Sequence, residues 1–468
     1  MYKFPEKFVF GVATAAYQAE GNTKVDDRGP CYWDDYLEKS KKFDPNTASD
    51  FYHKYQEDIE FCKAYGVNGI RISISWSRIL PEGEGKVNPK GIDYYNKLID
   101  TCVENGVEPF VTLHHFDTPL PLYEEGDWLQ RRMIDCFVNY ASICFENFGD
   151  RVTKWFTINE PWSLAAGQYV IGHFPPNIKY DLGKAAQAMH NMVLAHAKVV
   201  NLYKTMNLNG NIGIIHILEP KFPINENSAN KRAALYEHTF CNRFMLDATL
   251  KGEYHPTTLQ IVNEILSENN GALSILDEDI IIMKEASTNI DFLGVNYYQS
   301  HFMEDYEGNS VINHNGTGEK DTSTYAIKGV GKRVIHPDVP TTDWDWSIYP
   351  EGLYQMLLEV YQGYGFTKPI YITENGVGVK EQLKDNTVDD TQRIDYIHGH
   401  LEAILRAIKE GVDVQGYFLW SLMDVFSWTN GYNKRYGLLY VDFETQERFI
   451  KKSAHWFKKI ATKKVLSK

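Results

Sequence analysis

Eight short runs of apolar residues recur along the chain, and segments with helical spacing lie between them. Each run is rich in β-branched and aromatic residues, which is typical of strands buried in a sheet. Strands that alternate with helices predict a parallel sheet, and eight such units predict an α/β fold, the closed (β/α)8 or TIM barrel. The runs span residues 8–17, 67–76, 107–116, 155–161, 211–217, 291–298, 369–376 and 414–420. The helical spacing is clearest in 91–104, 133–148, 183–206 and 391–409.

The chain is longer than most single domains but shows no internal boundary. It has 468 residues, and no linker rich in Pro, Gly or Ser interrupts it. We therefore expect one domain, residues 1–468, with elaborated loops after the barrel strands. The longest irregular stretch, 299–346, is rich in Gly, Asp, Asn and Thr and ends in Asp-Trp-Asp-Trp. A loop of this length is usually functional, although an insertion that only packs on the rim is an equal alternative.

The charge balance argues against some classes of partner. The formal net charge is −14, so neither nucleic acid nor an anionic membrane surface is an expected partner. A small anionic ligand is still compatible with this charge, because a local cationic pocket can dominate at short range.

The cysteines and the N-terminal segment predict a cytoplasmic protein. The six cysteines form no Cys-x-x-Cys pair and no zinc-ligand spacing, which favours free thiols in a reducing compartment. Segment 8–17 is short and follows acidic Glu6, so it is interpreted as a first core strand and not as a signal peptide. No apolar stretch approaches the length of a transmembrane helix.

Two of the eight runs end in a glutamate. The fourth ends in Asn159-Glu160-Pro161, and the seventh ends in Thr373-Glu374 followed by Asn-Gly. In a barrel of parallel strands the carboxyl ends of the strands meet at one rim, where barrel enzymes do their chemistry. Two carboxylates at one rim are the minimum set for cleaving a glycosidic bond. The alternative is that both are surface acids that merely cap strands.

Other strand ends carry polar or aromatic groups suited to binding a sugar. Any one of them alone is more often a satisfied structural group than a ligand contact. Their recurrence at successive strand ends indicates a sugar-binding cleft, and 30 Tyr and 10 Trp supply flat faces for stacking on pyranose rings. These groups are Gln18, Arg71, Trp76, His115, Asn159, Asn296, Tyr298 and Trp420.

The motifs resemble those of glycoside hydrolase family 1, which contains β-glucosidases and 6-phospho-β-glycosidases. The resemblance runs from residues 8–11 to residues 452–454, and the Asn-Glu-Pro and Thr-Glu-Asn-Gly motifs are specific when they occur together in this order. It implies that Glu160 is the general acid/base and Glu374 the nucleophile, with Arg71 and Tyr298 as partners of the nucleophile. It also implies that Asn159 binds the sugar 2-hydroxyl.

The chemistry of retaining hydrolysis agrees with this division of roles. It needs two carboxyl groups roughly 5–5.5 Å apart, one protonated and one ionised. The cation of Arg71 and the phenol of Tyr298 should keep Glu374 ionised and aimed at the anomeric carbon. Glu160 needs a raised pKa to hold a proton near neutrality, and the negative charge of Glu374 should help to raise it.

The segment after the eighth run predicts a phosphorylated sugar. Family members that cleave unphosphorylated glucosides typically have Glu where this chain has Ser427, and that carboxylate would repel a phosphate by about 4 kcal/mol at 4 Å. Ser427, Lys434 and Tyr436 instead supply one ammonium and two hydroxyls, a set that suits three phosphate oxygens and resembles the 6-phospho-β-glycosidases. The alternative is a surface turn with solvated side chains. Arg435 is interpreted as structural.

Trp428 favours a galactoside. The 6-phospho-β-galactosidases of the family keep a Trp directly after the Ser, and an indole N–H could bond the axial 4-hydroxyl of galactose. We therefore expect retaining cleavage of phosphorylated disaccharides such as lactose 6-phosphate to galactose 6-phosphate and glucose. With no His-Glu-x-x-His and no Gly-rich phosphate loop, no metal or cofactor is expected. The sequence leaves the oligomeric state open.

Four alternatives stay open. The nearest is a 6-phospho-β-glucosidase acting on substrates such as cellobiose 6-phosphate, which would differ in the Trp428 contact. An unphosphorylated β-glycosidase is disfavoured by Ser427. A catalytically dead sugar-phosphate binding protein is disfavoured by the intact glutamates Glu160 and Glu374. A barrel with no ligand would not explain the polar strand ends.

Overall fold

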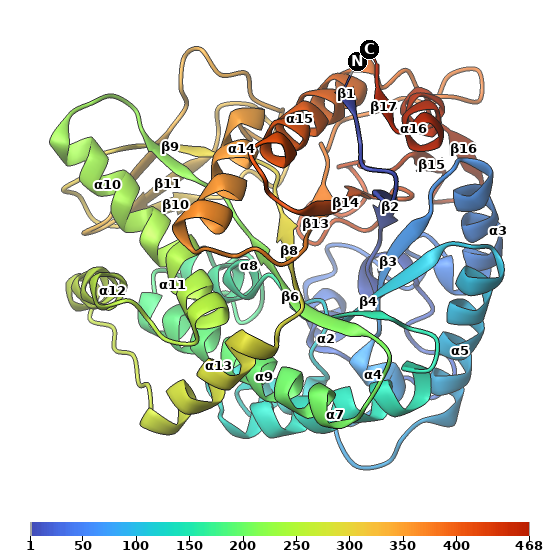
Figure 1. The fold of residues 1–468 in the computed structure, drawn as a ribbon, viewed down its shortest axis with the longest axis horizontal. Coiled ribbons are helices and arrows are strands. Elements are labelled where there is room, and N and C mark those ends of the chain that lie inside the picture. The colour runs from blue at the N-terminus through green and yellow to red at the C-terminus, as the bar shows by residue number, and fades with distance from the viewer. Residues whose placement is uncertain (1, 468) are drawn as a thin grey trace.

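The computed structural model of the protein describes residues 2–467, and its centre is a closed barrel of eight parallel strands (Figure 1). The strands follow one another around the barrel in chain order, and the last pairs with the first. Each predicted run overlaps one of them, so the predicted (β/α)8 fold is confirmed. They are β2 (Val9–Ala13), β3 (Gly69–Ser73), β4 (Glu108–His114), β5 (Lys154–Asn159), β6 (Asn211–Ile217), β8 (Phe292–Asn296), β13 (Ile370–Asn375) and β14 (Val414–Trp420).

Amphipathic helices surround the barrel, and α5 shows why they form. Its first residue is Pro89, whose missing N–H needs no partner there, and the side chain of Asn88 accepts from Lys90 N at 3.1 Å. Buried residues then recur at 94, 95, 98, 99 and 102, which form one face of the helix. The main helices are α2 (Tyr32–Ser40), α3 (Phe51–Ala64), α5 (Pro89–Glu104), α7 (Arg132–Phe148), α9 (Leu182–Thr205), α10 (Ser228–His238), α12 (Pro256–Glu268), α13 (Asp277–Asn289), α14 (Pro350–Leu358), α15 (Thr391–Lys409) and α16 (Lys452–Lys463).

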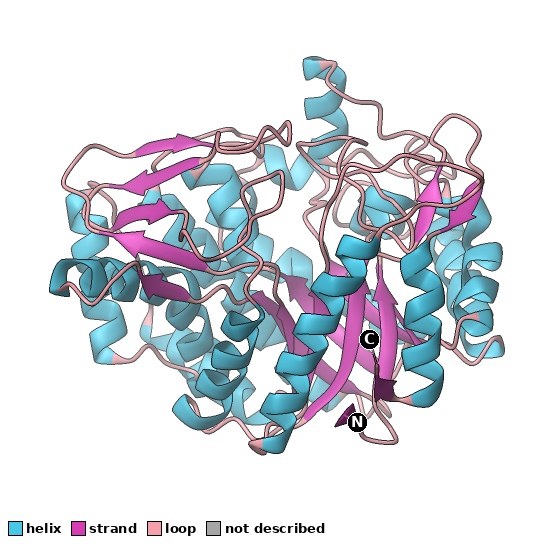
Figure 2. Ribbon diagram, turned by 90° about the horizontal axis from the view of Figure 1, so that it is seen from above, coloured by secondary structure: helices cyan, strands magenta, loops and turns pink. Residues whose placement is uncertain are grey.

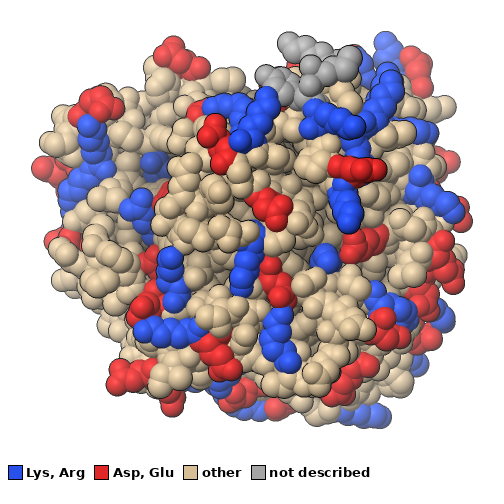
Figure 3. Space-filling view, viewed as in Figure 1, with Lys and Arg blue, Asp and Glu red and all other residues tan. Residues whose placement is uncertain are grey.

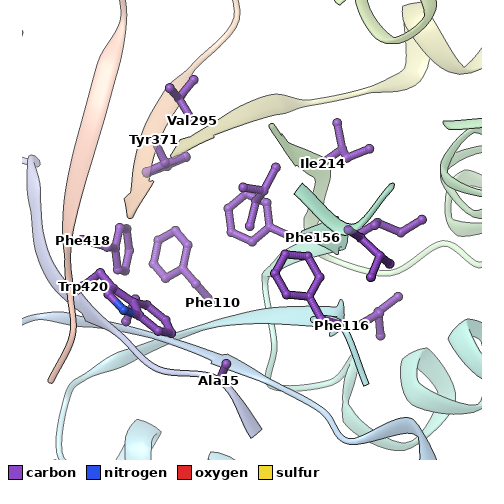
Figure 4. Packing of buried hydrophobic residues seen from close by; sticks show 14 of the residues in the cluster. Ala15, Phe110, Phe116, Phe156, Ile214, Val295, Tyr371, Phe418 and Trp420 are labelled. Carbon is purple, nitrogen blue, oxygen red and sulfur yellow. The ribbon is translucent and has the colours of Figure 1, made fainter. Parts of the chain in front are cut away.

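Aromatic rings fill the interior of the barrel (Figure 4). The ring centre of Phe110 lies 4.6 Å from that of Phe418 and 5.2 Å from that of Tyr371. A Cβ on Gly11 would lie 2.3 Å from the ring of Phe418, so the close approach of strand and ring requires glycine there. Because the interior is a packed core and not a pore, polar side chains at the strand ends are directed to the rim.

The prediction that 299–346 is irregular is wrong. The segment contains four short strands, which form a five-stranded sheet of order β10-β11-β12-β9-β7, in which β9 pairs with β7 (Lys221–Pro223). Figure 2 shows this sheet beside the barrel, away from both chain termini. Strands of three or four residues between turn-forming residues are too short to produce a readable alternation. The four strands are β9 (His301–Glu304), β10 (Val311–Asn313), β11 (Thr324–Ile327) and β12 (Gly331–Val334).

The structure can be compared with several predictions about the whole chain. Segment 8–17 contains barrel strand β2, as expected of a core strand. All six cysteines are free and buried. Basic and acidic side chains are interspersed on the face shown in Figure 3. No helix within residues 2–467 is both long and apolar enough to cross a membrane. That the chain is one domain, and that it binds no nucleic acid or membrane surface, stay predictions.

Candidate active site

A cavity of about 630 Å³ lies at the carboxyl ends of the barrel strands. Arg71 and Asn296 are fully buried outside its lining and contact the side chains that form it. The structure thus brings together every predicted site residue that follows a strand, apart from Trp76. The predicted residues that line the cavity are Gln18, His115, Asn159, Glu160, Tyr298, Glu374, Trp420, Ser427, Trp428, Lys434 and Tyr436.

Trp76 was wrongly placed at the rim. The strand β3 ends at Ser73, and Trp76 begins the short helix α4 (Trp76–Ile79), which turns the side chain into the core. Its indole Nε1 donates to the carbonyl of Gly83 at 2.9 Å, and its ring stacks on Tyr140 with ring centres 4.8 Å apart. The N–H group and one ring face of Trp76 are therefore in contact with other parts of the protein.

Glu374, in β13, is bound at both carboxylate oxygens. Oε1 forms an ion pair with Arg71, and Oε2 accepts from the Tyr298 hydroxyl at 2.7 Å. Arg71 is in turn held by Thr112 Oγ1 at 3.0 Å and by Asn159 Oδ1 at 2.7 Å. Because one donor lies on β3 and the other follows β8, the carboxylate has little freedom to rotate.

Glu160 follows directly after β5, in the left-handed backbone region with φ 46° and ψ 69°. Its backbone N–H donates to the carbonyl of Ile215 at 2.9 Å, and its Oε1 accepts from Asn296 Nδ2 at 2.5 Å. Burial and, as the second cause, the negative charge of Glu374 raise the pKa of Glu160 to about 8. The expected rise is confirmed, with burial as the larger cause.

Asn159 and Asn296 connect these two carboxyl groups. Asn159 Oδ1 accepts from Arg71 and also from Asn296 Nδ2 at 3.1 Å. Asn296 Oδ1 accepts from Thr373 Oγ1 at 2.6 Å. Because Arg71 can only donate, Asn159 Oδ1 must accept, and this sets the orientation of the Asn296 amide. Asn296 therefore lies below the cavity and bonds to the protein, and its predicted contact with a sugar stays a prediction.

Lys434 is a buried lysine without an acidic partner. Its side chain is buried, and it forms no ion pair with any of the residues that the structure describes. Nζ lies 3.5 Å from a ring centre of Trp346 and 4.8 Å from one of Trp344, in cation–π contact. Burial lowers the pKa of Lys434 well below its ordinary value. Cation–π contact leaves the N–H donors of the ammonium available to an anion.

Ser427 and Tyr436 line the same cavity as Lys434, and Lys434 Nζ lies 5.6 Å from the centre of the Tyr436 ring. Ser427 opens a tight turn, in which its N–H donates to Gly431 O at 2.7 Å and its carbonyl accepts from Asn430 N at 2.6 Å. Within residues 2–467, no hydrogen bond joins the hydroxyl of Ser427 or of Tyr436 to another side chain or to the backbone. The three predicted donors therefore line one cavity, and no acceptor group of residues 2–467 bonds to them.

Comparison with known proteins places this site in a family. The sequence profile described as "Glycosyl hydrolase family 1" matches residues 1–466. The chain belongs to glycosyl hydrolase family 1. It is 61% identical to a 6-phospho-beta-galactosidase of Clostridium acetobutylicum, over 100% of this chain and 98% of that protein. It is 54% identical to a 6-phospho-beta-galactosidase of Leptotrichia buccalis, over 99% of each chain.

Solved structures of family 1 share the fold. The beta-glucosidase of Thermotoga maritima in complex with castanospermine superposes with a TM-score of 0.88 at 36% identity and covers 100% of both chains. The same enzyme in complex with deoxynojirimycin also gives a TM-score of 0.88. Family 1 enzymes are retaining glycosidases, so the predicted fold and enzyme class are confirmed.

The remaining predicted contacts lie on the walls of the family 1 cavity. Gln18 Nε2 donates to the carbonyl of Phe426 at 2.7 Å, while its Oε1 is buried without a partner among residues 2–467. The ring centres of Trp420 and His115 are 5.9 Å apart, nearly parallel. Trp428 takes a left-handed backbone with φ 29° and stacks on Tyr17 at 5.8 Å. Their predicted binding of sugar hydroxyls and ring faces stays a prediction.

Trp346, which contacts Lys434, was missed as a site residue. It comes from the Asp-Trp-Asp-Trp end of segment 299–346, so this segment lines the cavity. Asp345 is held by backbone N–H groups at Asp321, 2.6 Å away, and Ser323, 2.9 Å away, and Trp344 Nε1 donates to Asn430 Oδ1 at 2.8 Å. The paired tryptophans were the only feature of the sequence that could have indicated a site residue here. They are far from Lys434 in the sequence, so the contact could not be predicted.

Proposed function

We propose that this family 1 enzyme hydrolyses 6-phospho-β-D-galactosides, cleaving lactose 6-phosphate to galactose 6-phosphate and glucose with retention of configuration. The observation that carries the proposal is Lys434, a buried amine that forms no ion pair with a carboxylate of residues 2–467, in a cavity that has a serine in place of an acid at position 427. The names of the relatives in Clostridium acetobutylicum and Leptotrichia buccalis agree with it.

A phosphate on the sugar 6-position explains the chemistry of this wall. A dianion beside Lys434 would reverse the lowering of its pKa, because an opposite charge favours the protonated amine. The free hydroxyls of Ser427 and Tyr436 would donate to the other phosphate oxygens, and such charge-assisted hydrogen bonds are among the strong ones. A neutral 6-hydroxyl would leave the buried ammonium without an anion.

The carboxyl groups then carry out a double displacement. Glu374 attacks the anomeric carbon while Glu160, protonated below a pKa of about 8, gives its proton to the glycosidic oxygen. The bond to the leaving glucose breaks, and a glycosyl ester forms on Glu374. The ester carries no charge, so the electrostatic part of the rise in the Glu160 pKa is lost. Glu160 can then remove a proton from the water that hydrolyses the ester.

The galactoside preference rests on Trp428. Its ring is fixed between aromatic neighbours, with its centre 4.8 Å from that of Trp33 as well as stacked on Tyr17, so its indole edge has a defined direction at the cavity. An N–H in a fixed position could bond an axial 4-hydroxyl and would miss an equatorial one. Free, buried cysteines agree with catalysis in the cytosol, where phosphorylated sugars arise during uptake.

Calorimetric titration with the reaction product tests the phosphate site directly. We expect galactose 6-phosphate to bind the wild-type enzyme at least about 100-fold more tightly than galactose, the equivalent of roughly 3 kcal/mol from one charged contact. Glucose 6-phosphate should bind more weakly than galactose 6-phosphate. Equal affinities for galactose and galactose 6-phosphate would reject the proposal, and a preference for glucose 6-phosphate would favour the 6-phospho-β-glucosidase alternative.

A further inference from the structure

Arg435 lies between two of the proposed phosphate ligands and points the other way. Its backbone pairs with Val379 in an antiparallel bridge, with N–H···O distances of 3.0 and 3.1 Å. In such extended backbone, residues i and i+2 share a face and residue i+1 takes the opposite one. Lys434 and Tyr436 accordingly line the cavity, and Arg435 faces the protein behind it.

On the side away from the cavity, Arg435 belongs to a network of buried charged residues. Asp424 accepts from Arg435 Nη1 and from Lys451 Nζ, both at 2.7 Å. Lys451 also pairs with Glu381 at 2.6 Å, and Glu381 pairs with Arg393 at 2.6 Å. Arg393 in turn donates to the carbonyl of Arg435 at 3.0 Å, so the contacts form a closed ring. We call these five residues the buried ion network; apart from the 14% exposed Arg435, each side chain is at most 2% exposed.

The network holds the loop that carries all three proposed phosphate ligands. This loop runs from Asp424 to Gly437, and Asp424 Oδ1 accepts from Gly437 N at 2.9 Å, which ties its two ends together. The cavity wall packs closely against this loop, since a Cβ on Gly378 would lie 2.5 Å from Cε of Lys434. A small shift of the Arg435 backbone would therefore move the Lys434 ammonium and the Tyr436 hydroxyl relative to the bound sugar.

We propose that the buried ion network is the positioning device of the phosphate pocket. Buried ion pairs add little net stability compared with apolar packing, but they can define one geometry. This network touches the loop from behind and none of its members lines the cavity, so its effect on catalysis is transmitted through Lys434 and Tyr436. The inference rests on the proposed function of that pocket.

Kinetics of Arg435→Met test the role of the network. With 4-nitrophenyl β-galactoside 6-phosphate we expect KM to rise about tenfold, from a misplaced phosphate contact, and kcat to stay within about threefold, because the carboxyl groups are untouched. With the unphosphorylated 4-nitrophenyl β-galactoside, kcat/KM should be unchanged. Arg435→Lys keeps a cation for Asp424 and should restore most of the affinity.

A matched control separates positioning from general loss of stability. Arg151 is also partly buried and pairs with Asp100 at 2.6 Å, but it belongs to the turn between α7 and β5, at the amino ends of the strands. Arg151→Met should leave KM for the phosphorylated substrate unchanged. Equal losses of kcat/KM on both substrates in Arg435→Met would overturn the inference, since they would indicate a structural role alone.

Two further variants test the inference if Arg435→Met fails to fold, and separate it from the proposed function. If Arg435→Met does not fold, Arg393→Lys removes the bond to the Arg435 carbonyl while it keeps the charge. It should raise KM for the phosphorylated substrate about threefold, and an unchanged KM overturns the inference. Lys434→Met tests the phosphate pocket separately from the network. If this variant keeps the preference for phosphorylated substrate, the proposed pocket itself is wrong. If only Lys434→Met weakens that preference, the pocket is right and the network does not position it.

Discussion

The side-chain amide of Asn296 donates a 2.5 Å hydrogen bond to Oε1 of Glu160. Nδ2 also donates to Asn159 Oδ1 at 3.1 Å, and that oxygen is fixed as an acceptor because it accepts from Arg71, which can only donate. The amide therefore cannot turn over, and Nδ2 faces the glutamate. Oε1 is therefore kept as an acceptor, and the proton of the neutral acid belongs on Oε2. Asn296 thus orients the proposed proton donor from below the cavity.

Asn296→Ala should impair acid catalysis selectively. We expect kcat/KM for lactose 6-phosphate, whose leaving group needs a proton, to fall about 100-fold. The loss with a 2,4-dinitrophenyl β-galactoside 6-phosphate should be at least tenfold smaller, because dinitrophenolate leaves without protonation. Equal losses on both substrates would mean that Asn296 binds the sugar and does not act through Glu160.

The pKa of Glu160 predicts the alkaline limb of the pH profile. Protonation of Glu160 is needed for the first step, so kcat/KM for lactose 6-phosphate should decline above about pH 8 with the slope of one proton. Glu160→Gln should abolish that limb for a dinitrophenyl substrate. A wild-type decline centred near pH 5 would contradict the assignment.

The same pKa predicts a pH-dependent effect on stability. Below the ordinary pKa of 4.5 both folded and unfolded states keep the proton, but between 4.5 and about 8 only the folded state keeps it. Unfolding then releases a proton and becomes more favourable as the pH rises. Glu160→Gln cannot ionise, so its Tm should exceed that of the wild type by more at pH 8 than at pH 5. A Tm difference that shrinks as the pH rises would show that the sign is wrong.

Glu374→Gln should remove turnover while leaving the protein folded. An amide cannot form the glycosyl ester, so kcat should drop by about 10⁴-fold or more. Gln can still accept from Tyr298, and galactose 6-phosphate should still bind in a calorimetric titration. Near-normal hydrolysis by this variant would remove Glu374 as the nucleophile.

Ser427→Glu should convert the phosphate wall into a repulsive one. A carboxylate about 4 Å from the phosphate disfavours binding by about 4 kcal/mol, so KM for 4-nitrophenyl β-galactoside 6-phosphate should rise by about 10²- to 10³-fold. The unphosphorylated galactoside, measured on the same variant, is the control and should lose no affinity. An unchanged KM for the phosphorylated substrate would place the phosphate elsewhere.

The sequence predicted the barrel and most of the cavity wall because both depend on local patterns. Strands buried on both faces appear as continuous apolar runs, and groups such as Glu160 and Glu374 follow directly at their ends. The small sheet of 301–334 could not be predicted, because its strands have only three or four residues and β9 pairs with β7, some 80 residues earlier in the chain.

Tertiary contacts account for the rest of what was missed. The sequence places Trp346 and Lys434 far apart, so their cation–π contact could not be foreseen. Trp76 was misplaced because a helix begins three residues after its strand ends. The major cause of the Glu160 pKa rise is burial, which depends on the packed structure around the residue.

The central claim is that the enzyme requires a 6-phosphate on a β-galactoside, and kcat/KM on four substrates tests it most directly. These are the 4-nitrophenyl β-galactoside and β-glucoside and the 6-phosphate of each. We predict activity confined to the phosphorylated pair, with the galactoside 6-phosphate the better of the two. Equal or higher activity on the neutral sugars would contradict the account of Ser427, Lys434 and Tyr436.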